Sequence, residues 1–453
     1  MQNKKNIIII GTGEIGMNIA SRLLMQGHDV SVIEKDKKKL DNLSNNFDVK
    51  AIHGNGCLPK NLKAAGAETA DALIALSSVD EVNMVACQVA YSLYDIKLRM
   101  ARIYNHDYLD DDCKGLFNDD DLPVDYIISP EEQVADRLLQ TLSIPKALDS
   151  VYFAGKKQVA FALKLTKEFK YFGTDIEEVA KTIPYKFKTM LLSRGDRTIV
   201  PSRNDHFEIN DIAYFLISSE DVEDFMGSIG FITSPSKNIL IIGGGNTGYA
   251  VARELEKHSY NIKVVEKDFQ RANYLAETLV NSTVINIDAM NFRNLDDTNL
   301  ANLDIVLNLT NSDEVNSLCS MYEHQVGVEN IYTLIKNNLL GDLTHNMHYA
   351  KVITPRNISA SKIIKFLRNA KIYNLYNIEN DSAEIMEIKI SKTSPLNGMT
   401  VKHFNERKDA KIGAVINQKG ISFDTDTIMH ADDRIIVVVL KDSLPKFYDL
   451  IEK

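Results

Sequence analysis

The sequence is poor in cysteine, has no long hydrophobic run and carries no excess of basic residues. Its four cysteines lie far apart without a C-x-x-C pair, which argues for a reducing compartment and against a zinc site. The longest apolar runs, Ile212–Ile217 and Ile435–Leu440, are six residues each, far short of the ~20 that a membrane-spanning helix needs. The first residues lead into a strand pattern and not into a signal sequence. We therefore expect a soluble, cytoplasmic protein.

The charge balance excludes another class of function. The formal net charge is −10 and no block of Lys or Arg is long enough to form a nucleic-acid arm, whereas a protein that binds phosphate backbones is expected to be basic. With 44% apolar and 25% charged residues in 453, the chain can bury several ordinary cores. Its length alone suggests roughly three domains, or four if the chain is duplicated.

The most informative stretch is residues 5–16, where an apolar run ends on G-x-G-x-x-G and a helical pattern follows. This order predicts a buried parallel strand, a tight glycine turn and a helix N-terminus. The free N–H groups of such a helix start stabilise a pyrophosphate. A second strand pattern, Val30–Ile33, ends on Glu34, which lies 18 residues after Gly16. A carboxylate at that distance can accept hydrogen bonds from the ribose hydroxyls of an adenosine.

The same constellation occurs a second time. Residues 237–268 match residues 5–36 at 14 of 32 positions without a gap, and Glu266 takes the place of Glu34. The loop at 310–316 then repeats the loop at 77–83. The whole chain is therefore read as one tandem duplication.

Each half is predicted to contain a Rossmann-like domain followed by a small lobe. Alternating strands and helices predict an α/β fold with a doubly wound parallel sheet. Alternation in the segments after it predicts a small α+β lobe with a mainly antiparallel sheet. The predicted boundaries are 1–136, 137–234, 235–370 and 371–453, with the main break at Ser234-Pro235-Ser236. Helical patterns at Val134–Leu142 and Ile358–Leu367 are expected to leave their domains and pack elsewhere, as contacts between subunits.

Several residues at predicted strand ends are candidates for the ligand crevice. Ser77 and Ser78 lie where a ribose or base would be expected, and Arg102 is the cation placed to hold a phosphate. Ser78-x-x-Glu81 and Asn311-x-x-Glu314 also have the form of capping boxes, which only start helices. Asn55 and Asp288 end the third strands, where a turn-forming role is the alternative to ligand contact.

The two halves differ in ways that predict unequal sites. Glu14, whose carboxylate is expected to repel a pyrophosphate, is replaced by Asn246, and Arg102 is replaced by Leu334. The acidic stretch around Asp107–Asp121 could bind a cation, but such runs are usually solvated loops. His345-x-x-His348 has partial metal-ligand spacing without a third ligand. No nucleophile–base pair or catalytic pair of carboxylates is recognisable from the sequence.

Taken together, these motifs resemble the peripheral subunit of bacterial Trk potassium-uptake systems. The resemblance covers essentially the full length and rests on Gly11–Gly16, Val32–Asp36, Ser77–Ala90, Ala101–Asn105 and their second-half copies. It implies two tandem domains that regulate potassium conductance, each with a Rossmann-like lobe and a small lobe. The ligand residues that it implies are Gly11, Thr12, Gly13, Glu14, Ile15, Glu34, Ser77, Ser78 and Arg102, and in the second half Gly243, Gly244, Gly245, Asn246, Thr247 and Glu266.

The resemblance implies a gating subunit and not an enzyme. Such a subunit would bind NAD(H) or ATP/ADP, form a ring of several double-length chains, and sit on the cytoplasmic face of a membrane-embedded Trk transporter. An NAD-dependent oxidoreductase is the alternative from another class, but it needs a proton donor and a substrate pocket that the sequence does not assign. A stand-alone nucleotide sensor is the third possibility.

Overall fold

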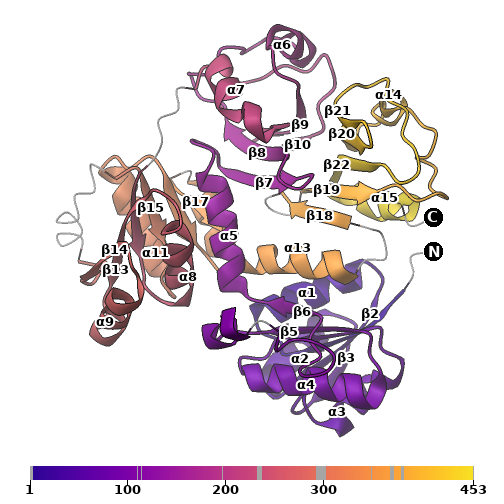
Figure 1. Ribbon diagram of the computed structural model, residues 1–453, viewed down its shortest axis with the longest axis vertical. Helices are drawn as coiled ribbons and strands as arrows, with labels where there is room; N and C mark the ends of the chain where they lie inside the picture. The colour runs from indigo at the N-terminus through magenta and orange to yellow at the C-terminus, as the bar shows by residue number, and fades with distance from the viewer. Residues whose placement is uncertain are drawn as a thin grey trace. The chain divides into compact units, whose positions relative to one another are not determined.

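The computed structural model describes residues 4–109, 111–113, 115–195, 197–231, 237–291, 303–347, 349–367, 372–378 and 382–451. Their contacts divide the chain into two compact units, Met1–Pro130 with Arg356–Asn369, and Glu131–Pro355 with Ala370–Lys453. The first unit holds one Rossmann-like lobe, and the second holds the other such lobe with both small lobes (Figure 1). The predicted break at 234–236 lies outside the described residues. The four domain boundaries therefore stay a prediction.

The first Rossmann-like lobe is a six-stranded parallel sheet of order β3-β2-β1-β4-β5-β6, the strand order of dinucleotide-binding folds. Its strands are β1 (Asn6–Ile10), β2 (Asp29–Glu34), β3 (Lys50–His53), β4 (Ala72–Ala75), β5 (Leu98–Arg102) and β6 (Tyr126–Ile128). Its helices are α1 (Glu14–Met25), α2 (Lys37–Asn46), α3 (Pro59–Ala65) and α4 (Asp80–Tyr94). Helices cover both faces, so Ile7–Ile10 of β1 are buried throughout. A continuous β-branched run is what such a central strand requires.

The second Rossmann-like lobe repeats this topology, with the order β14-β13-β12-β15-β16-β17. Its strands are β12 (Asn238–Ile242), β13 (Asn261–Glu266), β14 (Ser282–Asn286), β15 (Ile305–Asn308), β16 (Ile331–Leu334) and β17 (Lys351–Ile353). Its described helices are α8 (Asn246–Leu255), α9 (Phe269–Thr278), α11 (Asp313–Gln325) and α12 (Asn338–Asn346). The predicted α/β fold with tandem doubly wound parallel sheets is confirmed.

Both small lobes contain a five-stranded antiparallel sheet of the same order, β10-β9-β11-β8-β7 and β21-β20-β22-β19-β18. The first contains β7 (Asp149–Phe153), β8 (Gln158–Lys164), β9 (Phe187–Arg194), β10 (Arg197–Ile199), β11 (Ile212–Ser218), α6 (Ile176–Thr182) and α7 (Val222–Ile229). The second contains β18 (Ile372–Asn377), β19 (Ala383–Lys389), β20 (Ala410–Asn417), β21 (Gly420–Ser422), β22 (Arg434–Leu440), α14 (Val401–Phe404) and α15 (Leu444–Ile451).

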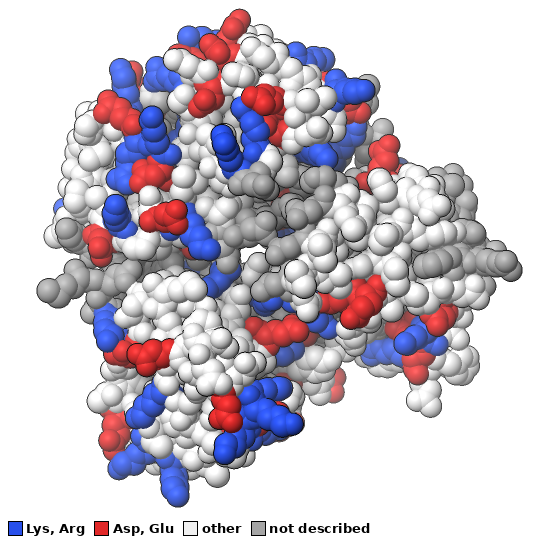
Figure 2. All heavy atoms as spheres, turned by 180° about the vertical axis from the view of Figure 1, so that it is seen from behind, with Lys and Arg blue, Asp and Glu red and all other residues white. Residues whose placement is uncertain are grey.

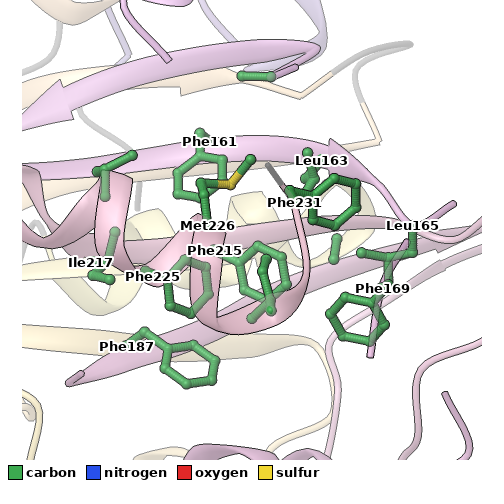
Figure 3. Packing of buried hydrophobic residues seen from close by; sticks show 14 of the residues in the cluster. Phe161, Leu163, Leu165, Phe169, Phe187, Phe215, Ile217, Phe225, Met226 and Phe231 are labelled. Carbon is green, nitrogen blue, oxygen red and sulfur yellow. The ribbon is translucent and has the colours of Figure 1, made fainter. Parts of the chain in front are cut away.

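The two small lobes pack sheet against sheet inside the second unit. One face of the first sheet lies under α7 and forms a core rich in phenylalanine, including Phe161, Phe215 and Phe225 (Figure 3). The opposite face shares a second apolar cluster with the sheet of the other small lobe. The contact is close, because a Cβ on Gly413 would lie 2.3 Å from the sulfur of Met190. Strands buried on both faces explain the six-residue apolar runs of β11 and β22.

The two exit helices are exchanged between the halves of the chain. Helix α5 (Pro130–Leu142) follows the first sheet but packs in the second unit, where the Glu132 carboxylate lies 2.6 Å from the guanidinium of Arg253 on α8. Helix α13 (Pro355–Leu367) follows the second sheet but packs in the first unit, with the Phe366 ring 4.1 Å from that of Tyr126. Figure 1 shows α5 beside the second Rossmann-like lobe and α13 beside the first. Contacts of these helices between subunits stay a prediction.

Candidate functional site

The first glycine turn leaves an open helix start at the carboxyl end of β1. Gly11 has φ +93°, and a Cβ there would meet the Leu76 carbonyl oxygen at 2.9 Å. A Cβ on Gly16 would lie 2.1 Å from the Gly11 carbonyl oxygen, so both positions require glycine. Gly13 is the N-cap of α1 and has open space around its missing side chain. The first N–H groups of α1 therefore face space in which an anion can be held.

Glu34 lies buried at the floor of this turn, 8% exposed. Its Oε2 accepts hydrogen bonds from the N–H and hydroxyl of Thr12 at 2.7 and 2.8 Å, and its Oε1 accepts one from the N–H of Asp36 at 2.9 Å. Burial by itself raises the pKa of Glu34, but the hydrogen bonds from Asp36 and Thr12 outweigh burial and the pKa is lowered. The side chain is thus an ionised acceptor beside the turn, as the sequence predicts.

The loop that carries Ser77 is held in place by Asn83, a residue that the sequence analysis did not select. The Asn83 side chain is fully buried, and its Oδ1 accepts a hydrogen bond from the Ser77 N–H at 2.9 Å. Its Nδ2 donates to the Ser77 carbonyl at 3.0 Å and to the Arg102 carbonyl at 2.8 Å. One amide therefore ties the ends of β4 and β5 together. Asp80 adds a second tie, because its carboxylate accepts from the N–H groups that follow β5, at Tyr104 and Asn105.

The capping boxes expected at these loops are wrong. Helix α4 has Val79 as its N-cap without a side-chain cap, while the Ser77 hydroxyl bonds with the carbonyl and N–H of Val79. In the second half the cap is Ser312, whose Oγ accepts from Val315, and not Asn311. The aspartates that open the two helices, Asp80 and Asp313, instead accept from main-chain N–H groups that follow the next strand. Glu314 accepts from the hydroxyl of the cap residue Ser312. Ser78 is left exposed at the crevice edge.

Arg102 lies at the carboxyl end of β5, as predicted for a residue of the crevice. Its main-chain carbonyl is held by Asn83, and its guanidinium stacks over the Tyr104 ring at 5.6 Å. The contact with Tyr104 orients the guanidinium, a planar cation of the kind that suits phosphate oxygens.

The second crevice reproduces the first. Gly243 has φ +102° and presses against Thr310, and the Glu266 carboxylate accepts from the N–H groups of Gly244 at 2.8 Å and Asp268 at 2.9 Å. Asn316 is the counterpart of Asn83, accepting from the Thr310 N–H and donating to the carbonyl that ends β16. The tandem duplication thus includes the supports of the site as well as the glycine turn.

One cation distinguishes the second crevice. Arg271, near the start of α9, donates from Nε to the Gly244 carbonyl at 2.8 Å. Its guanidinium lies 5.7 Å from the ring of Tyr249 and 4.7 Å from that of Tyr274. Arg271 lies between the recognisable motifs, so no sequence pattern marks it. A basic side chain three residues after the Asp that caps a helix is common and carries no signal by itself.

The remaining candidates behave as ordinary structure. The Asn55 and Asp288 side chains accept from N–H groups two residues ahead, which is a turn-forming role. Asp119 of the acidic stretch pairs with Arg99 at 2.7 Å, and Asp110 lies outside the described residues. The side chains of His345 and His348 also lie outside the described part. Among the residues that the structure describes, no group of three or more His, Cys, Asp or Glu could hold a metal ion.

Helix length and surface charge bear on the kinds of partner that the chain can have. None of the described helices is both long and apolar enough to cross a membrane. On the face drawn in Figure 2, basic and acidic side chains are interspersed and neither sign forms a continuous field.

The fold defines a protein with two Rossmann-like lobes, each of which carries a glycine turn beside an acidic side chain at the carboxyl ends of its strands. The family model for the TrkA-N domain matches residues 7–130 and 239–355, and that for the TrkA-C domain matches residues 385–452. The chain belongs to the TrkA family.

Curated relatives agree with this assignment, and solved structures share the fold. The chain is 32% identical to the Trk system potassium uptake protein TrkA of Azorhizobium caulinodans, covering 98% of each chain. It is 30% identical to that of Halomonas elongata over 96% of this chain and 95% of the relative. Among solved structures, the GsuK RCK domain has a TM-score of 0.62 at 15% identity, covering 99% of this chain and 95% of that one. The GsuK channel bound to NAD also has a TM-score of 0.62 at 15% identity, covering 99% and 79%. At these identities the structural likeness shows the fold alone.

Proposed function

We propose that this chain is the cytoplasmic regulatory subunit of a Trk-type potassium uptake transporter, and that adenine nucleotides bound in its two crevices control ion flow. The observation that carries the proposal is the full-length match to TrkA relatives together with a complete glycine turn and acidic partner in both halves. The predicted domains form two pairs, 1–136 with 137–234 and 235–370 with 371–453. In each pair the first domain binds the nucleotide and the second transmits its effect.

The proposed ligands are NAD(H), ATP or ADP. The N–H groups at the starts of α1 and α8 hold the phosphates, and Glu34 and Glu266 accept from the adenosine ribose. An ionised carboxylate at that point repels a 2′-phosphate, so NADP is disfavoured. Ser77, Ser78 and Arg102 complete the first crevice. The NAD-bound neighbour of the same fold supports this ligand class without identifying the ligand of this chain.

Gating requires that the ligand bind one arrangement of the subunits better than another. Only that difference in affinity can shift the population between conducting and closed forms. The exchanged helices α5 and α13 are the proposed route, because each joins one half of the chain to the Rossmann-like lobe of the other half. A ring of several chains would then transmit the shift to the membrane-embedded subunit.

The test is potassium flux through the transporter reconstituted with this chain. Flux is expected to change when NADH, NAD, ATP or ADP is added, and to lose that response when Glu34 and Glu266 are both replaced by Ala. Flux that stays the same with and without this chain would overturn the proposal.

Two further measurements separate the alternatives. Hydride transfer between NADH and small carbonyl compounds, measured with purified protein, would indicate an oxidoreductase. Nucleotide binding without co-purification of a multi-span membrane protein would indicate a stand-alone sensor.

A further inference from the structure

The second Rossmann-like lobe contains a buried polar cluster that the first lobe lacks. The cluster consists of Asn308 at the end of β15, Ser320 and Glu323 on α11, and Thr333 on β16, all 0% exposed. Asn308 and Thr333 are register partners in the parallel sheet, so their side chains lie on the same face, toward α11. The corresponding positions of the first lobe are Ala75, Cys87, Ala90 and Ala101, which belong to one apolar cluster.

The hydrogen bonds of this cluster are incomplete. Asn308 Nδ2 donates to Ser320 Oγ at 3.0 Å and to Glu323 Oε2 at 2.7 Å, and Ser320 Oγ donates to the Asn316 carbonyl at 2.8 Å. Three buried oxygens have no partner among the described residues: Asn308 Oδ1, Glu323 Oε1 and Thr333 Oγ1. Unsatisfied buried polar atoms are rare and costly, because their hydration is lost without replacement. Two of these oxygens, Asn308 Oδ1 and Oε1 of an ionised Glu323, can only accept, so each lacks a donor.

Among the residues that the structure describes, none places a positive charge beside Glu323 to balance a carboxylate. No ion pair of Glu323 occurs within the described residues; burial raises its pKa to about 8, and the single hydrogen bond from Asn308 lowers it less. On its own helix the neighbouring titratable group is Cys319, whose pKa is raised by burial, by Glu323 and by Asp288. On β16 the phenol of Tyr332 is directed to the opposite face, where it bonds with the Ala147 carbonyl. Strand β15 contributes only the neutral amide of Asn308.

We propose that Glu323 is a proton-binding site that makes the second nucleotide crevice sensitive to pH. A proton on Oε1 removes the buried charge and supplies the missing donor, because Oε1–H can donate to Asn308 Oδ1 while Asn308 Nδ2 donates to Oε2. The acid and the amide then form a pair with two hydrogen bonds. When the proton leaves to solvent, one of these bonds is lost and a buried charge remains. A proton also needs no extra volume, unlike a metal ion, for which three oxygens would be an incomplete shell.

The cluster is connected to the crevice by short covalent and hydrogen-bonded paths. Asn308 is two residues before Thr310, whose main chain lies against Gly243 of the glycine turn. Ser320 is bonded to the carbonyl of Asn316, the residue that holds the Thr310 loop. Ionisation of Glu323 is therefore expected to loosen the loop and weaken nucleotide binding as the pH rises. This coupling rests on the proposed function, whereas the proton site itself does not.

The proton site is tested by infrared pH-difference spectroscopy of the full-length protein without nucleotide. We expect a protonated-carboxyl band at pH 7 that disappears above about pH 9 and is absent from Glu323→Gln. Glu277→Gln, an exposed carboxylate on α9, is the matched control and should keep the band. Absence of the band in the wild type at pH 7 would show an ionised Glu323 and overturn the site. A thermal midpoint that rises specifically with Na⁺ or K⁺ in the wild type, but not in Glu323→Gln, would show that the site binds a metal cation and not a proton.

The coupling is tested by nucleotide affinity of the second crevice in a Glu34→Ala background. We expect affinity to fall about fivefold or more between pH 7 and pH 9, and the fall to vanish in Glu323→Gln. If Glu323→Gln does not fold, the variant N308A/S320C/E323A/T333A serves instead, because it installs the core that the first lobe already packs. If the carboxyl band titrates but the nucleotide affinity does not change with pH, the coupling is refuted and the proton site stands. Failure of both crevices to bind any nucleotide would refute the proposed function and leave the infrared result standing.

Discussion

Replacing Glu34 tests how the first crevice recognises a nucleotide. Its Oε2 already accepts two hydrogen bonds from Thr12, whereas Oε1 accepts one from the Asp36 N–H. A carboxylate oxygen can accept about two hydrogen bonds, so Oε1 is the atom with room for a ribose hydroxyl. A hydrogen bond to a charged group contributes about 1.5–3 kcal/mol. Glu34→Ala is therefore expected to weaken binding at this site by about 10- to 150-fold.

Glu34→Gln separates the charge from the shape of the side chain. Its amide can keep an acceptor toward Thr12 but then places an NH₂ group against the Asp36 N–H, which is also a donor. We expect a loss of NADH affinity similar to that of Glu34→Ala. We also expect weaker discrimination against NADPH, because the charge that repels a 2′-phosphate is gone.

The assay is calorimetric titration with NADH, NAD, ATP and ADP. Glu266→Ala is the matched variant of the second crevice, where the same carboxylate accepts from Gly244 and Asp268. Each substitution should remove one class of site and leave the other. If neither substitution weakens the binding of any nucleotide, the assignment of both crevices is wrong.

Three further predictions follow from charge and burial. Glu14→Asn gives the first crevice the residue found in the second. It should strengthen nucleotide binding by about threefold at low salt, because an exposed carboxylate near the helix start repels the phosphates. An unchanged affinity in calorimetry would show that the phosphates bind elsewhere. Asn83→Ala leaves three main-chain groups unpaired and should destabilise the first lobe by about 2–4 kcal/mol, measured by denaturant unfolding against an exposed Asn46→Ala control. Burial lowers the pKa of the Lys351 ammonium to about 7, from its ordinary value of 10.5. At pH values between these two, the unfolded chain binds one more proton than the folded chain. The free energy of unfolding should therefore rise by about 1.4 kcal/mol per pH unit in this range. Lys351→Met should abolish that rise, and an identical pH profile of the thermal midpoint would contradict the reasoning.

Local patterns in the sequence were sufficient for the parts of the site that are contiguous in the chain. The strand, glycine turn and helix start of each half form within about a dozen residues, and the spacing to Glu34 and Glu266 follows from one strand–helix–strand unit. The repeat, at an offset of 232 residues at the glycine turn (237 − 5) and 233 at the next loop (310 − 77), then predicted the second lobe. Element bounds were less sharp: the helices expected at 134–142 and 358–367 begin at Pro130 and Pro355.

The supports of the site could not be predicted in the same way, because they join separate strands. Asn83 resembles any polar residue in the first turns of a helix, and only the placement of β4 beside β5 gives its amide three main-chain partners. Asp80 opens helix α4, and only the tertiary structure brings its carboxylate to the N–H groups that follow β5. Arg271 gained its role from two tyrosines that approach it in space.

The sequence by itself determined what lies close along the chain: two parallel-sheet lobes, their glycine turns, their acidic partners and the duplication that relates them. The tertiary structure alone decided which half each exit helix joins and how the small lobes cover each other's sheets. It also placed Glu323 in a lobe interior where the described residues supply no counter-charge. Hydrophobic periodicity specifies which face of an element is buried but not against what. Partners are selected by packing and by the need to satisfy buried polar groups.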